Sequence, residues 1–294
     1  MKRGTIILFV VCVLTMAGSI FAGTPPSDAE AWIRNGISLE DRGDASGAIK
    51  AYRKAIDIDP RSVQAYQRLG NIYRAVGNPK AALAAFRQAV QIAPNDPLSH
   101  FYLGRMLYET GNLTEAKGEL STAAEKDPQM IEATVLLAMV KNREGDYAGA
   151  ISTLQNVIKN NPDFIPAYLT LGNIFVDRNL WSDAIKEFQE AVKIDDSQPE
   201  SHRSLGFAYM QLGNLNKAIT ELIVAVELAP NYALAYYNLA EAYLAKGMKK
   251  EAISNYKKFL QISSPDRDAD LRLKATAAIK TLSVGETAGT KPKP

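Results

Sequence analysis

The chain has 294 residues, with 34 Lys or Arg against 32 Asp or Glu, two histidines and one cysteine. This near balance of charge argues against nucleic-acid binding through bulk electrostatics, and one cysteine cannot form an internal disulfide. His100 and His202 lie far apart, so no zinc-ligand spacing exists, and neither a phosphate-binding loop nor a nucleophile elbow occurs. We therefore expect no cofactor, no metal, no nucleic-acid partner and no enzymatic activity.

Residues 1–22 follow the order of a secretory signal peptide. Lys2 and Arg3 precede an apolar run that contains Cys12, and small residues lead to Ala22, after which we expect cleavage. This predicts an exported protein in which residues 23–28 form a linker. The alternative is an uncleaved anchor, because residues 5–22 just reach the length that spans a bilayer. Only in that case do we expect contact with the membrane.

A pattern with a period of 34 residues then runs without insertion through most of the chain. Position 20 of the pattern is alanine in every copy, position 8 is glycine or alanine, and position 32 is usually proline. A fixed period of this length is typical of a helical solenoid. The seven copies are 29–62, 63–96, 97–130, 131–164, 165–198, 199–232 and 233–265.

The pattern resembles the tetratricopeptide repeat. The second copy matches it nearly throughout, with Tyr66, Leu69, Gly70, Tyr73, Ala82, Phe86, Ala89 and Pro94. The resemblance implies an all-α fold, a right-handed α-solenoid superhelix of seven helix-turn-helix repeats. The first copy departs from the pattern at Asn35 and Leu39, and the fourth at Thr134, Ala138 and Lys141. We expect these two repeats to be the least tightly packed.

Residues within each repeat also have predicted structural roles. Six glycines and Asn179 lie where the first helix ends and a left-handed residue is favoured. His100, His202 and Trp32 occupy position 4, where the family has a bulky packing residue, and Trp181 occupies a position held by Leu or Tyr elsewhere. We expect all four to pack rather than to bind a ligand.

The two ends of the array have helix signals of their own. Ser27 to Glu30 has the spacing of a capping box, and Ser264 with Pro265 suits the start of a further helix. From there Leu271, Ala275 and Ile279 belong to one apolar stripe. We predict a capping helix over 266–282 and a disordered tail over 283–294.

The expected function depends on a surface. In the family the first helices line the concave face, and ligands are contacted mostly from positions 2, 5, 6, 9, 12 and 13. The resemblance therefore implies a partner-binding groove with an apolar middle and flanking arginines. Val135 and Leu169 are equally compatible with packing against the next repeat. The candidate residues are Gln67, Asn71, Arg74, Phe101, Arg105, Tyr108, Val135, Met139, Asn142, Arg143, Leu169, Asn173, Val176, Arg203, Phe207, Met210 and Tyr237.

This mixture suits a peptide or an amphipathic helix of a partner protein. The carboxylate clamp of chaperone-binding relatives is absent, because Tyr102, Glu132 and Leu136 stand at its later positions. We expect a non-enzymatic scaffold or adaptor in the periplasm, by analogy for a pilus, secretion or polysaccharide-export assembly. The alternatives are a structural subunit anchored in the inner membrane, and a carrier of a glycan or small ligand.

Overall fold

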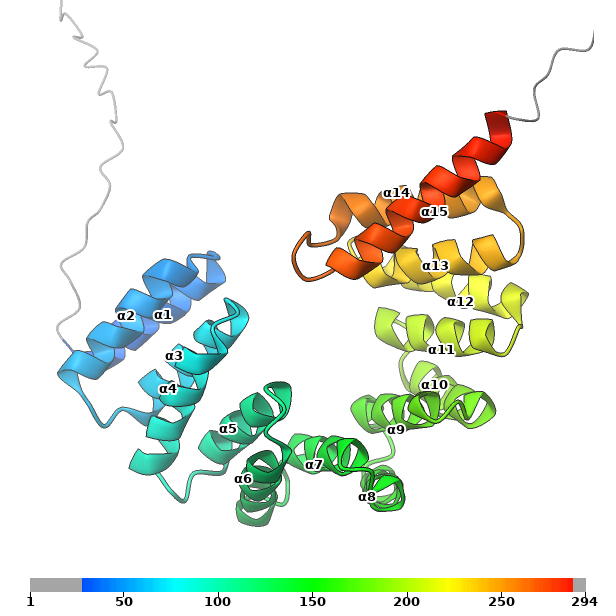
Figure 1. Ribbon diagram of the computed structural model, residues 1–294. Coiled ribbons are helices and arrows are strands. Elements are labelled where there is room, and N and C mark those ends of the chain that lie inside the picture. The colour runs from blue at the N-terminus through cyan, green and yellow to red at the C-terminus, as the bar shows by residue number, and fades with distance from the viewer. Residues whose placement is uncertain (1–27, 288–294) are drawn as a thin grey trace, which may run out of the picture.

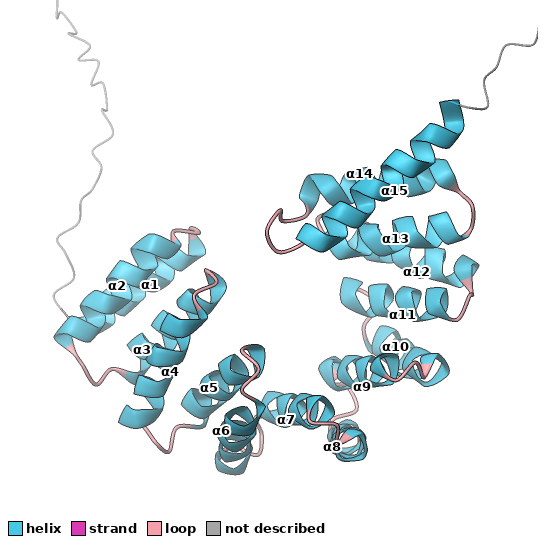
Figure 2. Ribbon diagram, in the orientation of Figure 1, coloured by secondary structure: helices cyan, strands magenta, loops and turns pink. Residues whose placement is uncertain are grey.

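The computed structural model describes residues 28–287, which form fifteen α-helices and no strand (Figures 1 and 2). Each repeat contributes two helices, the first of 13 and the second of 14 residues. The first helices are α1 (Ala29–Asp41), α3 (Val63–Ala75), α5 (Pro97–Glu109), α7 (Ile131–Arg143), α9 (Ile165–Asp177), α11 (Pro199–Gln211) and α13 (Ala233–Ala245). The second helices are α2 (Ala45–Ile58), α4 (Pro79–Ile92), α6 (Leu113–Lys126), α8 (Tyr147–Asn160), α10 (Trp181–Ile194), α12 (Leu215–Leu228) and α14 (Lys249–Ile262), and α15 (Ala269–Thr287) ends the array.

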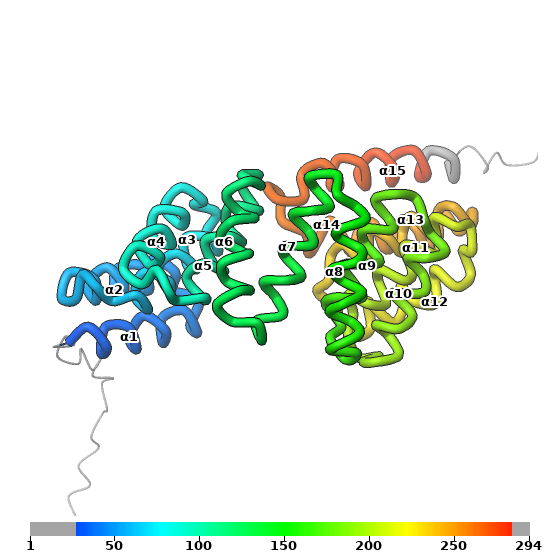
Figure 3. Tube along the Cα trace, turned by 90° about the horizontal axis from the view of Figure 1, so that it is seen from below, coloured from blue at the N-terminus to red at the C-terminus, as the bar shows by residue number. Residues whose placement is uncertain are grey.

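The helix pairs stack along an arc, with α1 at one end and α15 at the other (Figure 1). Each helix packs against the next, and from α3 to α13 each odd-numbered helix also contacts the following odd-numbered helix. In Figure 1, α5 and α7 lie toward the inside of the arc, whereas α6 and α8 lie outside. Figure 3 shows the same stack from below. The predicted all-α solenoid is confirmed, and its odd-numbered helices form the inner, concave face.

The turn within each repeat is set by one left-handed residue. Gly43 has φ +76°, and Asn179, which replaces glycine in the fifth repeat, has φ +57°. In the first repeat the Gly43 N–H donates to the Glu40 carbonyl and the Asp44 N–H to that of Leu39, the two bonds of a Schellman turn. The Asp44 carboxylate then accepts from the Gly47 N–H and caps α2. Three residues thus end one helix and start its antiparallel neighbour.

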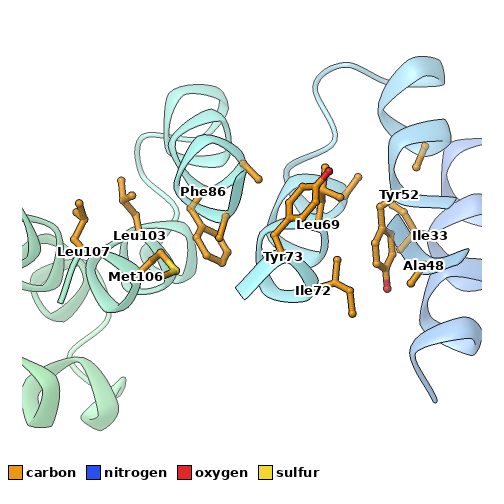
Figure 4. Packing of buried hydrophobic residues seen from close by; sticks show 14 of the residues in the cluster. Ile33, Ala48, Tyr52, Leu69, Ile72, Tyr73, Phe86, Leu103, Met106 and Leu107 are labelled. Atoms are coloured by element: carbon orange, nitrogen blue, oxygen red, sulfur yellow. The ribbon is translucent and has the colours of Figure 1, made fainter. Parts of the chain in front are cut away.

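The two helices of a repeat approach closely where position 8 meets position 24. A Cβ atom added to Gly70 would lie 2.4 Å from the Phe86 ring, and one added to Gly36 would lie equally close to the Tyr52 ring. Phe86 and Tyr52 are themselves fully buried. Figure 4 shows both rings in a core that continues from one repeat into the next. Repeats one to three therefore share one apolar core, as expected for a solenoid.

In repeats three, five and six, the side chain at position 4 forms a hydrogen bond to the repeat before it. The His100 ring is buried, with Nδ1 2.6 Å from a Glu119 carboxylate oxygen and Nε2 3.0 Å from the Pro94 carbonyl. His202 has the same two contacts, at 2.7 Å from Glu221 and 2.9 Å from the Asp196 carbonyl. In the fifth repeat the hydroxyl of Tyr168 donates to the equivalent carbonyl, that of Pro162. Both histidines are thus packing residues.

Packing differs between the two repeats that depart from the pattern. In the fourth, Thr134 stands where other repeats have an aromatic ring or histidine, and a hollow of about 270 Å³ lies beside it. The first repeat does not show the expected loose packing between its own helices. Its Ala48, Tyr52 and Ala55 are fully buried, because the Tyr52 ring fills the space beside Gly36.

Both ends of the array differ from the sequence-based prediction. Asp28 caps α1, since its carboxylate accepts from the Ala31 N–H, and Ser27 of the predicted capping box lies outside the described residues. Ser264 accepts from the Arg267 N–H in a turn that precedes α15, so this helix begins at Ala269 rather than 266. Its C-terminal end is at Thr287, so the prediction of a disordered tail is wrong for 283–287. The predicted signal peptide, Ala22 and residues 288–294 lie outside the described residues.

Within residues 28–287, no helix combines the length and apolar character needed to cross a bilayer.

Candidate functional site

The concave face of the odd-numbered helices contains the candidate residues, but two of them are not available at its surface. Gln67 is only 9% exposed, and its amide donates to Asp96 at 2.7 Å and to Ser99 at 2.9 Å. Val135 is 6% exposed and belongs to the core shared by the fourth and fifth repeats. Both side chains pack between repeats. The prediction of an exposed contact residue is therefore wrong for Gln67, and of the two roles left open for Val135 the structure shows packing.

Positions 12 and 13 form a ladder along one edge of the concave face. In each of three successive steps, position 12 of one repeat contacts position 13 of the next. Arg74 forms a 3.1 Å ion pair with Glu109, and the Asn142 amide donates to Asp177 at 3.0 Å. Between these two pairs, Arg143 lies 4.2 Å above the Tyr108 ring and donates to the Tyr108 carbonyl. These side chains join neighbouring repeats in addition to facing the groove.

Arg105 is held more firmly than the sequence predicted. Its guanidinium donates to Asn71 at 2.8 Å and lies 5.5 Å from the Phe101 ring centre and 5.2 Å from that of Tyr102. Burial lowers the pKa of this guanidinium, and the positive charge of Arg74 adds to the effect. The sequence places Arg105 among the arginines that flank the groove. It is half-buried, because it lies between two aromatic side chains of its own helix and Asn71 of the preceding repeat.

The C-terminal part of the concave face is largely occupied by packing. Arg203 donates to the Tyr232 hydroxyl at 2.7 Å, and burial raises the pKa of that hydroxyl. Phe207 lies edge-on to Trp181, with 6.3 Å between ring centres. Tyr237 packs against two aromatic rings of α14. The remaining candidates of this part, Leu169, Val176 and Met210, are half-buried against the core of repeats five to seven.

A hollow of about 340 Å³ lies at the centre of the concave face, over α5, α7 and α9. Five of the candidates line it, together with three residues that the candidate list had omitted. Its apolar part comes from Met139 and Ile174. The lining residues are Tyr108, Met139, Asn142, Arg143, Thr170, Asn173, Ile174 and Asp177.

The walls of this central hollow offer unused hydrogen-bonding groups. Asn142 Oδ1 is buried and has no partner among the described residues. Its orientation is fixed, because the amide nitrogen of the same side chain donates to the Asp177 carboxylate. Arg143 is exposed and uses one nitrogen for the Tyr108 carbonyl, and the exposed Asn173 side chain has no hydrogen bond within the described residues. The site thus combines acceptors, donors and an apolar floor.

A second, smaller hollow of about 190 Å³ lies over α3 and α5. Its wall includes Gln67 and Asn71, and the residues missed by the candidate list are Gln64, Arg68, Leu98 and Tyr102. Like Thr170 and Asp177 of the central hollow, these occupy positions 2, 6 and 13 of their repeats. The family pattern named those positions, whereas the candidates came mainly from positions 5, 9 and 12.

Neither hollow has the composition of a metal site. Among the described residues, no three His, Cys, Asp or Glu side chains lie close enough to hold a metal ion.

A curved stack of helix pairs with an open concave face defines a helical-repeat scaffold, and sequence comparison places this chain in one family. Models of the tetratricopeptide repeat match residues 38–77, 73–140, 132–163, 172–213, 208–247 and 233–266, most of the chain. The chain therefore belongs to the tetratricopeptide repeat family, whose members are protein–protein interaction scaffolds. No curated protein matches its sequence significantly.

Solved structures agree on the fold. The chain aligns with yeast Tom70 at a TM-score of 0.76 and 20% identity, over 90% of this chain and 57% of Tom70. A tetratricopeptide repeat protein of Parabacteroides merdae aligns at a TM-score of 0.67 and 16% identity, over 87% of this chain and 98% of that one. The APC/C hetero-tetramer Cut9–Hcn1 aligns at a TM-score of 0.63 and 20% identity, over 88% of this chain and 50% of that one. This chain thus spans little more than half of Tom70, and these identities establish the fold alone.

Proposed function

We propose that this protein is a non-enzymatic scaffold that binds a peptide or amphipathic helix of a partner protein in the central hollow over α5, α7 and α9. The observation that supports this most directly is Asn142 Oδ1, a buried acceptor without a donor. Such a group costs about 1–3 kcal/mol when left unpaired. A backbone N–H of a bound peptide would supply the missing donor.

The other groups of the hollow fit the same ligand. Arg143 has guanidinium nitrogens left for a carbonyl or carboxylate. Thr170 and Asn173 add polar contacts, while Met139 and Ile174 provide an apolar surface for one side chain. Polar groups that serve a main chain, beside an apolar patch that serves a side chain, are the usual elements of peptide recognition.

We further propose that the protein acts in the cell envelope, on a partner from a pilus, secretion or polysaccharide-export assembly. The support is the signal-peptide order of residues 1–22. Removal of that segment would leave 32 basic and 32 acidic side chains. N-terminal sequencing of the protein from its native host should find Gly23 first, in the periplasmic fraction. Intact Met1 in washed membranes would instead show an anchored protein.

Photo-crosslinking can test the groove before the partner is known. A photoreactive residue at Asn173 should crosslink one envelope protein in the native host, because this exposed side chain lies in the central hollow. The matched control is Asn216, which is exposed on the outer helix α12. Equal crosslinking from both positions would contradict binding in the groove.

Substitutions then test the individual contacts with the partner fragment so identified. Asn173→Ala and Met139→Ala should each weaken binding about fivefold or more, as expected for interface contacts worth about 1 kcal/mol or more. Circular dichroism should show unchanged helical content. Arg105→Glu is unsuitable for this purpose, because Arg105 packs between rings and would report on stability. If both alanine variants bind like wild type, a structural subunit or a glycan carrier becomes the better explanation.

A further inference from the structure

Basic residues are concentrated in one part of the array. Residues 45–92, from α2 to α4, contain eight Lys or Arg but only two Asp, in a chain whose formal net charge is +2. Arg68, Arg74 and Arg87 of this segment form ion pairs with glutamates of neighbouring helices. Lys50, Arg53 and Lys80 have no acidic partner among the described residues. The second helices of repeats one and two therefore leave uncompensated positive charge on the outer surface.

Arg53 lines an apolar hollow of about 300 Å³ that opens between α2 and α4, and Lys50 and Lys80 each lie within one helical turn of a lining residue. Tyr66, Leu69 and Tyr73 of α3 form its floor, the last two of which are labelled in Figure 4. One wall comes from Arg53, which donates to the Tyr73 hydroxyl at 2.6 Å. Lys50 is exposed on α2, one helical turn from Arg53.

The opposite wall of the hollow comes from α4 and consists of three alanines and Gln88. Ala81, Ala84 and Ala85 stand at positions 19, 22 and 23, and repeat two is the only one in which all three positions are alanine. Lys80 lies one helical turn from Ala84. Small side chains on this wall leave the space between α2 and α4 empty.

In repeat six, side chains fill the space that corresponds to this hollow. Tyr209 occupies the position of Tyr73, and the Gln189 amide donates to its hydroxyl at 3.0 Å, as Arg53 does to Tyr73. There, however, Lys217 lies 5.2 Å from the Tyr209 ring centre, and Glu221 reaches His202 at 2.7 Å. Ala81 and Ala85 stand at the positions of Lys217 and Glu221. The hollow in repeat two is thus the space that two long side chains occupy in repeat six.

We infer that this outer hollow is a second docking site, separate from the concave groove, for an acidic segment of a partner protein that inserts one bulky apolar side chain. The apolar floor and alanine wall accept the inserted side chain. The nearby cations attract carboxylates on either side of it. A volume near the lower end of ligand pockets suits a single aromatic anchor, and such anchors dominate binding energy at protein interfaces.

A synthetic peptide can test this docking site directly. The probe is a short fluorescein-labelled peptide of Glu and Ser with one central Trp, and the measurement is fluorescence anisotropy with the full-length protein. The Trp peptide should bind, and more weakly as salt is added, because surface charges are screened. Its Trp→Ala analogue should bind about tenfold more weakly, as expected for loss of an anchor. Equal binding of both peptides would overturn the proposed insertion.

Variants of the protein test the contribution of the hollow and that of the nearby cations separately. The double variant Ala81→Lys/Ala85→Glu fills the hollow with the side chains that repeat six accommodates, and it leaves the net charge unchanged. It should lower affinity for the Trp peptide about tenfold. Lys50→Glu/Lys80→Glu should also weaken binding and remove most of its salt dependence. Lys249→Glu/Lys257→Glu on α14 is the matched control for charge. The proposed site would be contradicted if the filled variant bound the Trp peptide like wild type. It would also be contradicted if the α14 control weakened binding as much as Lys50→Glu/Lys80→Glu does.

Two other occupants give different results in companion experiments. If anionic phosphatidylglycerol vesicles bind the wild type but the Trp peptide does not, the basic surface is a membrane contact and the proposal fails. If sedimentation shows self-association that the filled variant abolishes, the occupant is a second copy of the chain and the proposal again fails. The filled variant should retain binding to any partner of the concave groove, so this experiment is independent of the proposed function.

Discussion

Side chains of the concave face have two roles at once. Arg143 faces the central hollow, yet it also stacks on Tyr108 of the preceding repeat. Asn142 faces the same hollow and joins its repeat to Asp177 of the next. A substitution at such a position changes both a potential ligand contact and the coupling between repeats. Asn173, whose side chain has no hydrogen bond in the described part of the chain, isolates the ligand contact best.

His100 provides a prediction about coupling between repeats. His100→Ala should lower the free energy of unfolding by about 1–3 kcal/mol, because the Pro94 carbonyl and Glu119 both lose a partner. His100→Tyr should retain most of the stability, since Tyr168 donates to the equivalent carbonyl in repeat five. Chemical denaturation of the two variants beside wild type checks this. An equal loss in both would mean that the bond to the carbonyl contributes little.

At the scale of elements, α15 closes the C-terminal end of the array. Ala275 is fully buried, and the helix packs its apolar stripe on Tyr256 and Phe259 of α14. Arg272 donates to the Leu260 and Ser263 carbonyls at 2.6 and 3.1 Å, which satisfies groups at the end of α14. The helix therefore supplies both apolar cover and hydrogen bonds that another repeat would otherwise provide.

Removal of α15 should destabilise the protein. A chain that ends at Ser264 should unfold with a free energy at least about 2 kcal/mol lower than a chain that ends at Thr287, because the apolar surface of repeat seven becomes exposed. The chain that ends at Thr287 should behave like the full-length protein. Urea denaturation followed by circular dichroism measures the difference. Superimposable curves for the two truncations would show that α15 is not a cap.

The same end of the array should be sensitive to alkali. Burial raises the pKa of Tyr237 to about 12, helped by the charge of Glu241, and burial also raises the pKa of Tyr256. Unfolded tyrosine has a pKa of about 10. The folded state therefore favours the neutral phenols, and their contribution to stability is complete below about pH 10 and declines as the pH rises toward 12.

Tyr237→Phe tests this pH dependence, because phenylalanine keeps the packing and cannot ionise. The variant should lose less stability than wild type between about pH 10 and 12. Urea midpoints measured across that range check it, with the values near neutral pH as the reference. Parallel decline of wild type and variant would show that Tyr237 does not contribute to the loss.

At the scale of the whole molecule, the fourth repeat contains a poorly filled junction. The hollow of about 270 Å³ beside Thr134 extends to Pro128 at the end of repeat three and to Val157 of α8. In a solenoid each repeat is stabilised only by its neighbours, so one poorly filled junction weakens the coupling between the two halves.

Filling this hollow should stabilise the entire array. Thr134→Tyr would place a ring in the hollow and a hydroxyl toward the Pro128 carbonyl, as Tyr168 does with Pro162 in the next repeat. We expect a gain of about 0.5–2 kcal/mol, the usual range for cavity filling. Thermal unfolding measures it, with Tyr168→Thr as the reverse substitution, which should destabilise. A lower melting temperature for Thr134→Tyr would show that the hollow cannot accept the ring.

The sequence by itself determined the period, the first residue of each repeat, at which helices α1 to α13 of the odd-numbered set begin, and the residues of the left-handed turns. These features depend on local chemistry, such as the Gly43 turn and the close approach of Gly70 to Phe86, and they recur in each copy. Only the tertiary structure decided which side chains of the concave face stay available. A residue such as Arg105 or Gln67 is buried or exposed according to neighbours one repeat away in sequence.

The same reason explains the outer hollow and the end of the array. Ala81 and Ala85 are ordinary helix residues in sequence, and they leave a hollow only because α2 and α3 provide its other walls. The polar residues after Leu282 predicted a disordered tail, whereas α15 continues to Thr287 beyond the part that packs on repeat seven. The repeating local pattern therefore determined the helical scaffold, and contacts between repeats determined which side chains and hollows are present on its surfaces.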